Sequence, residues 1–418
     1  MFATRRFGKR NRGTTGDVPE DYLKSSTVRG LPSKGLAAPS SYLAGCMLVS
    51  LGIFTSATGG SWDITNHLLN KPESFFSSPH AMLYAGVGSA ILGCVFMFRA
   101  RDYMYRIYRS FRTSTRLVII GITMLVVAGP VDFAWHSAFG LDGLLSPPHF
   151  VLIMGLAISS LGSLIGLILY IGRQELYGGL YLGNFKPPRH KRIWVSLDFV
   201  RSRIFLFLPT LGIIPLWLSL AGMIAMFSLP FSKTQYFDFN PEPYFGAVVA
   251  TLGYPVLLSF ILIASFRLAN ERLGILSITA SIYMVISTVT VIIPNEWLVH
   301  TIPFYIINLV PIIAVDVLFA TSKHRIIYII GGGLLGSVFF MMQYPLITHV
   351  YNEVVTKQAF VWPSLTSSTY FEMFGQLYPF VALPGFTMGI IGALLANRIV
   401  PKNIGLSPKD KAIGGTLE

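Results

Sequence analysis

Apolar residues along this chain gather into long stretches separated by short polar segments. Each stretch is long enough to cross the ~30 Å hydrocarbon layer of a bilayer as a helix. Backbone polar groups inside lipid must bond within their own segment, so helices are expected rather than open strands. The pattern predicts an all-α, polytopic transmembrane helical bundle of about ten helices, at residues 41–60, 79–98, 116–133, 148–172, 204–229, 244–266, 274–293, 301–320, 326–347 and 374–397.

Basic residues alternate with these stretches. The two tails and every second loop hold 29 of the 32 lysines and arginines, whereas the five remaining loops hold only Lys71, Lys233 and Lys357. Cytoplasmic loops of membrane proteins retain lysine and arginine. We therefore expect a cell-membrane protein with both termini in the cytoplasm (N-in, C-in), which requires an even number of spans.

The same pattern divides the chain into five segments. Residues 1–40 are expected to form a disordered, basic cytoplasmic tail, and residues 398–418 a second cytoplasmic tail. A basic cytoplasmic loop at 173–203 separates the first four spans, within 41–172, from a six-helix membrane region at 204–397.

Composition agrees with a membrane protein. Hydrophobic residues make up 53% of the chain and charged residues 12%, which is about half the charged fraction of a soluble domain. The net charge of +13 is explained by cytoplasmic loops that face anionic lipid headgroups. The expected partners are the lipid bilayer and other membrane subunits, and nothing in the charge requires nucleic acid.

One polar motif occurs twice within the first four predicted spans. It reads D-x3-H-x5-[DE]-x6-H, and all of its positions recur at one constant interval, without gaps. In each copy the first Asp and His end one span, and the last His opens the next. The motif predicts a tandem two-helix repeat within residues 41–172. The copies are Asp63, His67, Glu73 and His80, then Asp132, His136, Asp142 and His149.

This spacing favours a metal site. Residues at i and i+4 share one helix face, and the short loop returns the chain so that the last His, beside a helix-starting proline, lies near them. One carboxylate and two imidazoles suit copper, non-haem iron or zinc. Glu73 and Asp142 are candidates for orienting an imidazole. In the alternative interpretation these side chains only cap helix ends and hydrogen-bond across helices. The predicted metal ligands are Asp63, His67, His80, Asp132, His136 and His149.

The second copy resembles the metal-binding motif of the C subunit of particulate methane and ammonia monooxygenases. That motif has Asp-x3-His, usually with Trp before the His, then an Asp six residues on and a closing His thirteen residues after the first. The matching residues here are Asp132, Trp135, His136, Asp142 and His149. The resemblance implies a copper site within the membrane region, with Asp132, His136 and His149 as ligands, and by duplication Asp63, His67 and His80.

The chain also departs from that family. The arginine that precedes the second Asp of the motif is replaced by Leu141, and by Pro72 in the first copy. The C subunit has about half as many helices and carries the motif once. The match covers about 110 of the 418 residues. The resemblance therefore supports a metal site more strongly than it supports an oxidation reaction.

A weaker candidate lies later in the chain. Glu296 and His300 again form an acid–histidine pair at a predicted span end, but the position thirteen residues after His300 is Ile313, so the closing ligand is lost.

Three classes of function follow from these patterns. The first is an integral membrane metal-binding protein, with copper foremost and iron or zinc as alternatives, related to the monooxygenase C subunit and either catalytic or accessory in a membrane complex. The second is a multipass transporter or permease for a metal or small solute, although transporters usually place polar sites near the bilayer midplane. The third is a structural membrane subunit without metal. No catalytic residue is assigned.

Overall fold

The computed structural model describes most of the predicted membrane region. Every described element is a helix, and no strand occurs in these ranges, which confirms the predicted all-α class for this part of the chain. The residues described are 38–68, 74–107, 109–140, 145–172, 191–228, 241–269, 271–293, 299, 301–322, 324–339 and 363–400.

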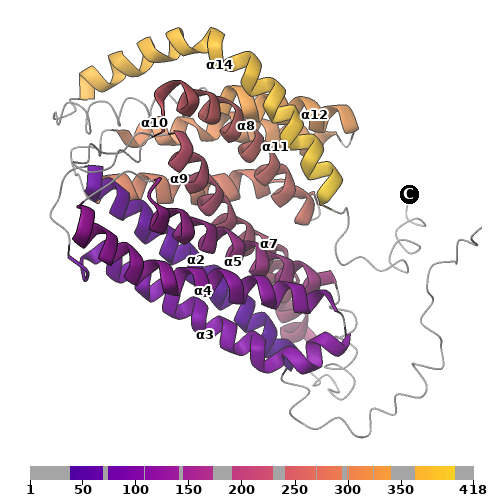
Figure 1. Cartoon of the computed structure of the whole chain (residues 1–418). Coiled ribbons are helices and arrows are strands. Elements are labelled where there is room, and N and C mark those ends of the chain that lie inside the picture. The colour runs from indigo at the N-terminus through magenta and orange to yellow at the C-terminus, as the bar shows by residue number, and fades with distance from the viewer. Residues whose placement is uncertain are drawn as a thin grey trace, which may run out of the picture. The chain divides into compact units, whose positions relative to one another are not determined.

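The helices follow one another along the chain from indigo α2 to yellow α14 (Figure 1). Their bounds are α2 (Ala38–Leu68), α3 (Ser78–Ile107), α4 (Ser110–Phe139), α5 (Pro147–Gly172), α7 (Lys191–Ser228), α8 (Pro243–Leu268), α9 (Ile275–Ile292), α10 (Ile302–Ile307), α11 (Leu309–Thr321), α12 (Arg325–Leu334), the π-helix η4 (Leu335–Phe339) and α14 (Pro363–Ile399).

Nine helical segments among the described residues are long and apolar enough to cross a membrane, and a tenth apolar helix, Arg325–Val338, is shorter. The prediction of a multipass membrane protein is thereby confirmed. The predicted span at 326–347 begins with that short helix, and its second part lies outside the described residues. The count of ten spans therefore stays a prediction.

The first four helices form two pairs, α2 with α3 and α4 with α5. A Cβ atom built on Gly86 would lie 2.5 Å from the carbonyl oxygen of Gly52, and one built on Gly121 would lie 2.6 Å from that of Gly155. Side chains at these points would force the helices apart. Glycine lets the two backbones of each pair touch, as is common between helices in membranes.

Two large hydrophobic cores occupy the described helices, beside a small cluster of Ile153 and Met226. One lies among α2 to α5, and the other lies mainly among α7 to α14. Hydroxyl groups connect the helices through this apolar interior. Ser50 donates to Ser163 (3.0 Å) between α2 and α5, and Ser61 donates to Thr290 (3.1 Å) between α2 and α9. Such bonds satisfy hydroxyl groups that have no water to bind.

Two buried charges in the second core tie helices together. Asp316 of α11 is 1% exposed, and its Oδ2 accepts from the backbone N (3.1 Å) and Oγ (2.7 Å) of Ser277 in the first turn of α9. A carboxylate placed there satisfies a free helix N–H and meets the positive end of the helix dipole. Arg267 donates to the carbonyl of Val400 and to Asn397, which fastens α8 to the end of α14.

Candidate metal centre

Two neighbouring helices place the second copy of the motif. Asp132 and His136 lie one turn apart near the end of α4, and His149 lies in the first turn of α5. The α5 helix begins with Pro147 and Pro148, which suit the first helical turn because its N–H groups have no partner within the helix. The antiparallel packing of α4 and α5 brings the ends of the two helices together.

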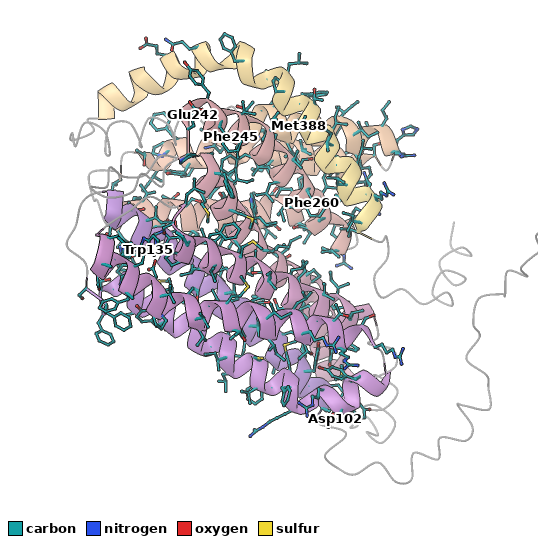
Figure 2. The ribbon with its side chains drawn as sticks, in the orientation of Figure 1. Asp102, Trp135, Glu242, Phe245, Phe260 and Met388 are labelled. Carbon is teal, nitrogen blue, oxygen red and sulfur yellow. The ribbon has the colours of Figure 1, made fainter. Side chains whose placement is uncertain are left out.

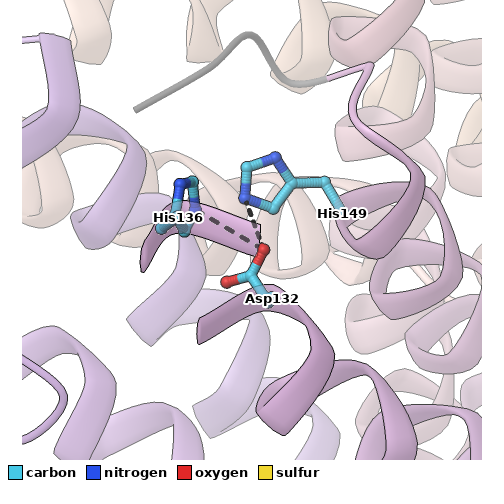
Figure 3. A group of neighbouring side chains, drawn as sticks. All are labelled: Asp132, His136 and His149. Carbon is cyan, nitrogen blue, oxygen red and sulfur yellow. Dashed lines mark ion pairs between the residues drawn. The ribbon is translucent and has the colours of Figure 1, made fainter. Parts of the chain in front are cut away.

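The three side chains converge as the sequence predicted (Figure 3). Oδ1 of Asp132 lies 3.5 Å from Nε2 of His136 and 3.2 Å from Nε2 of His149. One donor atom from each residue lies within 4.8 Å of the other two. The side chains are only 15–20% exposed. Among the described residues, this group has the composition and spacing of a metal site.

The opposite ring nitrogens are held by neighbouring groups. Nδ1 of His136 lies 3.1 Å from the carbonyl oxygen of Gly140, and Nδ1 of His149 lies 2.9 Å from Oγ of Ser146. Gly140 has a φ of 75°, a backbone conformation that glycine adopts without strain. This turn aims the Gly140 carbonyl back at His136.

The carbonyl partner fixes the tautomer of His136. A carbonyl oxygen only accepts, so Nδ1 must carry the proton. In a neutral imidazole Nε2 then presents its lone pair, and here that lone pair faces a carboxylate oxygen. Two acceptors facing each other repel unless a cation lies between them. That cation is either a proton on the imidazole or a metal ion bound by both groups.

The separations fit a metal ion. Donor atoms bound to one tetrahedral ion at ~2.0–2.1 Å lie about 3.3 Å from each other, and the two Nε2–Oδ1 distances of 3.2 and 3.5 Å bracket that value. Metal-bound histidines usually donate their other N–H to a carbonyl or a similar group, as His136 does. Three protein ligands also leave a coordination position for water or substrate.

The first copy of the motif makes the corresponding contact. Oδ1 of Asp63, at the end of α2, lies 3.0 Å from Nε2 of His80, at the start of α3. Nδ1 of His80 lies 2.9 Å from the carbonyl oxygen of Ser74, so this imidazole also carries its proton on Nδ1. His67 belongs to α2, but its side chain lies outside the described residues, and its predicted role as a ligand is untested.

An aromatic group adjoins both acidic residues. Tyr84 of α3 stacks with His80, with ring centres 6.1 Å apart, and it interacts electrostatically with both Asp63 and Asp132. Phe75 contacts Tyr84 and Phe133, with ring centres 5.1 Å apart in both cases. These rings connect the α2–α3 pair to α4 beside the two copies of the motif.

Some predicted residues lie outside the described part of the chain. They are Glu73 and Asp142, the proposed orienting acids, and the weaker pair Glu296 and His300. The structure also shows site neighbours that sequence analysis missed. Ser146 has a detectable signal, since a serine also stands three residues before His80 in the first copy. The Gly140 carbonyl and Tyr84 have no such repeat signal.

Comparison with known proteins adds no relative to this picture. No protein-family model, no curated protein and no solved structure matches this chain.

Proposed function

We propose that this chain is an integral membrane protein that binds a metal ion through Asp132, His136 and His149. One observation carries the proposal: two imidazole Nε2 atoms face the same carboxylate oxygen at 3.2 and 3.5 Å. The Nδ1 proton of His136 is donated to the carbonyl oxygen of Gly140, so Nε2 of the neutral ring offers a lone pair. A divalent cation bound between these atoms removes the repulsion and makes the arrangement favourable.

Copper is the metal we favour. Imidazole suits copper, zinc and iron, and a site with two histidines and one carboxylate accommodates each of them. The likeness of Asp132, Trp135, His136 and His149 to the motif of the copper monooxygenase C subunit selects copper among these. We propose that the chain is a divergent relative of that subunit and works, as catalyst or accessory, in a membrane complex.

We further propose that the α2–α3 and α4–α5 pairs are tandem repeats. Helix contacts support this beyond the motif itself. A Cβ atom on Gly93 would lie 2.8 Å from the backbone N of Val49, and one on Gly162 would lie 2.8 Å from that of Val118. The two pairs thus cross at matching points. Four positions at these crossings recur at the same interval as the motif, and they are Val49 with Val118, Gly52 with Gly121, Gly86 with Gly155, and Gly93 with Gly162.

The site is proposed to face the outside of the cell membrane, with both termini in the cytoplasm. Asp102, in the strongly basic segment that follows the second predicted span, and Trp135, beside the site, lie at opposite ends of the α2–α5 helices (Figure 2). The basic segment belongs in the cytoplasm under the positive-inside rule, and tryptophan is enriched at membrane interfaces. Both arguments support a site at the outer interface.

Elemental analysis of protein purified in detergent without chelators tests the metal site. We expect wild-type protein to retain copper, and His136→Ala and His149→Ala each to hold one equivalent less. His324→Asn is a matched control, because it removes an imidazole far along the chain while asparagine can keep the helix cap that His324 gives α12. Equal metal content in wild type and both site variants contradicts the proposal, and the three side chains then only tie α4 to α5.

A further inference from the structure

We infer that the α2–α3 pair builds a second metal site from Asp63, His67 and His80, adjacent to the first, so that filling one site weakens binding at the other. The inference rests on the proposed function of the Asp132 site. The inference adds a second bound metal ion and a coupling between the binding affinities of the two sites. Three observations support it, and each is independent of the metal identity.

The first observation is the contact between Asp63 and His80. Nδ1 of His80 faces a backbone carbonyl, which cannot donate, so the neutral imidazole turns the lone pair of Nε2 toward Oδ1 of Asp63 at 3.0 Å. Nε2 of His149 lies against Oδ1 of Asp132 in the same way, at 3.2 Å. A cation shared by the two groups makes it favourable here as well.

The second observation concerns the position of His67. It follows Asp63 by four residues on α2, which continues to Leu68, so the two Cα atoms lie one turn apart on one helix face. Asp132 and His136 have the same relation on α4. The glycine crossings match between the pairs at Gly52 and Gly121. The backbone of α2 therefore carries residue 67 in the place, relative to α3, that α4 gives His136 relative to α5.

The third observation is that a series of aromatic contacts joins the two copies of the motif. Tyr84 stacks with His80, the partner of Asp63, with ring centres 6.1 Å apart. Phe75 packs between Tyr84 and Phe133, next to Asp132 in sequence. Aromatic side chains beside charged sites screen charge poorly compared with water. Divalent ions in both sites therefore repel each other through this aromatic group.

The repulsion has a measurable consequence. A cation at one site raises the free energy of placing a cation at the other, and the effect is reciprocal. When one site is destroyed by losing a histidine, its carboxylate stays and its cation is gone. The affinity of the remaining site in such a variant should then be at least roughly fivefold higher than the affinity with which wild type binds its second ion.

Titration of metal-free protein with Zn²⁺ against a chelating dye tests the inference. The expected numbers of bound ions are two for wild type and for His324→Asn, one for His80→Ala, one for His149→Ala, and none for the double variant. If His80→Ala folds poorly, Asp63→Asn replaces it, because asparagine keeps the shape of the aspartate side chain. Asp63→Asn should also bind one ion. Wild type should fill in two distinguishable steps.

The outcomes separate this inference from the proposed function. If His149→Ala removes the one ion of wild type and His80→Ala retains it, there is no second site, and Asp63 and His80 form a structural ion pair. If wild type binds two ions with equal affinity, and neither variant tightens the remaining site, the coupling is wrong. If His149→Ala binds as many ions as wild type, the proposed function itself fails.

Discussion

Single atoms around the imidazole rings decide how well the site can hold an ion. Oγ of Ser146 bonds Nδ1 of His149. Ser77 is the corresponding serine of the first copy, and its Oγ is buried and has no hydrogen-bond partner in the described part of the chain. His80 uses the Ser74 carbonyl instead. The two copies therefore differ in how they orient their last histidine.

This difference gives a prediction with an internal control. Ser146→Ala removes the group that orients His149, so the affinity of the Asp132 site for Zn²⁺ should fall about tenfold, a typical loss when such a partner is deleted. Ser77→Ala deletes a hydroxyl that orients nothing and should leave both affinities unchanged. Competition with a chelating dye measures both variants. Equal effects of the two substitutions contradict the role assigned to Ser146.

Sequence analysis selected the candidate ligands because their chemistry recurs along the chain. Asp and His at i and i+4, followed by His after a proline, define one end of a helix pair without any coordinates. The groups that hold Nδ1 could not be predicted in the same way. Two of them are backbone carbonyls, of Ser74 and Gly140, and every residue has one. Only the turn conformation of Gly140, with its positive φ, selects that carbonyl.

Helix pairs are held by close backbone contact, and this gives a prediction at the scale of the element. Gly86→Ala would place a Cβ atom 2.5 Å from the Gly52 carbonyl, so α3 must move away from α2. Overpacking of this kind costs about 1–3 kcal/mol. We expect a lower unfolding midpoint in detergent and loss of the metal ion that Asp63 and His80 are proposed to bind.

Gly88→Ala is the matched control for that change. Position 88 is on the same helix, two residues on, and a Cβ atom built there meets no described atom within 4 Å. Alanine also favours a helix more than glycine does. The midpoint should therefore stay the same or rise slightly. A drop as large as that of Gly86→Ala would mean that helix propensity, rather than contact between α2 and α3, governs the stability of this pair.

Hydropathy predicted where the helices lie along the sequence. It did not predict interruptions within a helix or hydrogen bonds between helices. The apolar stretch 301–320 was predicted as one span, and Ile302–Thr321 is one, but its regular helix is interrupted at Asn308, where α10 ends and α11 begins. Pro311 has no N–H to bond the carbonyl of Ile307, and α10 ends at that residue. The amide of Asn308 donates to the carbonyl of Phe304. The sequence also did not predict the hydrogen bond that Ser277 of α9 donates to Asp316, because the two residues are 39 positions apart.

For the whole molecule, the number of spans decides on which side of the membrane the tails lie. Within the described ranges, nine long helices are apolar enough to cross a membrane, and the shorter Arg325–Val338 segment is also apolar. If that segment and the residues after it cross the membrane, the chain has ten spans and its ends share one side. If they do not, the ends lie on opposite sides. The distribution of basic residues favours ten, because it leaves 29 of 32 lysines and arginines on one side.

Reporter fusions test this prediction. A periplasmic-type phosphatase is active only outside the cytoplasm, and a fluorescent protein folds best inside. Fusions after residue 418 and before residue 1 should both report the cytoplasm, whereas a fusion at Lys357 should report the outside. A nine-span chain reverses the result at residue 418 and gives Lys357 the same side as the N-terminus. That result would also remove the positive-inside argument for the second half of the chain. It would leave the prediction for the first four spans unchanged. Six basic residues between 99 and 116 and seven between 173 and 203 follow the ends of these spans that lie away from the Asp–His groups, and the positive-inside rule assigns those ends to the cytoplasm. The proposed orientation of the Asp–His groups toward the outside would therefore stand.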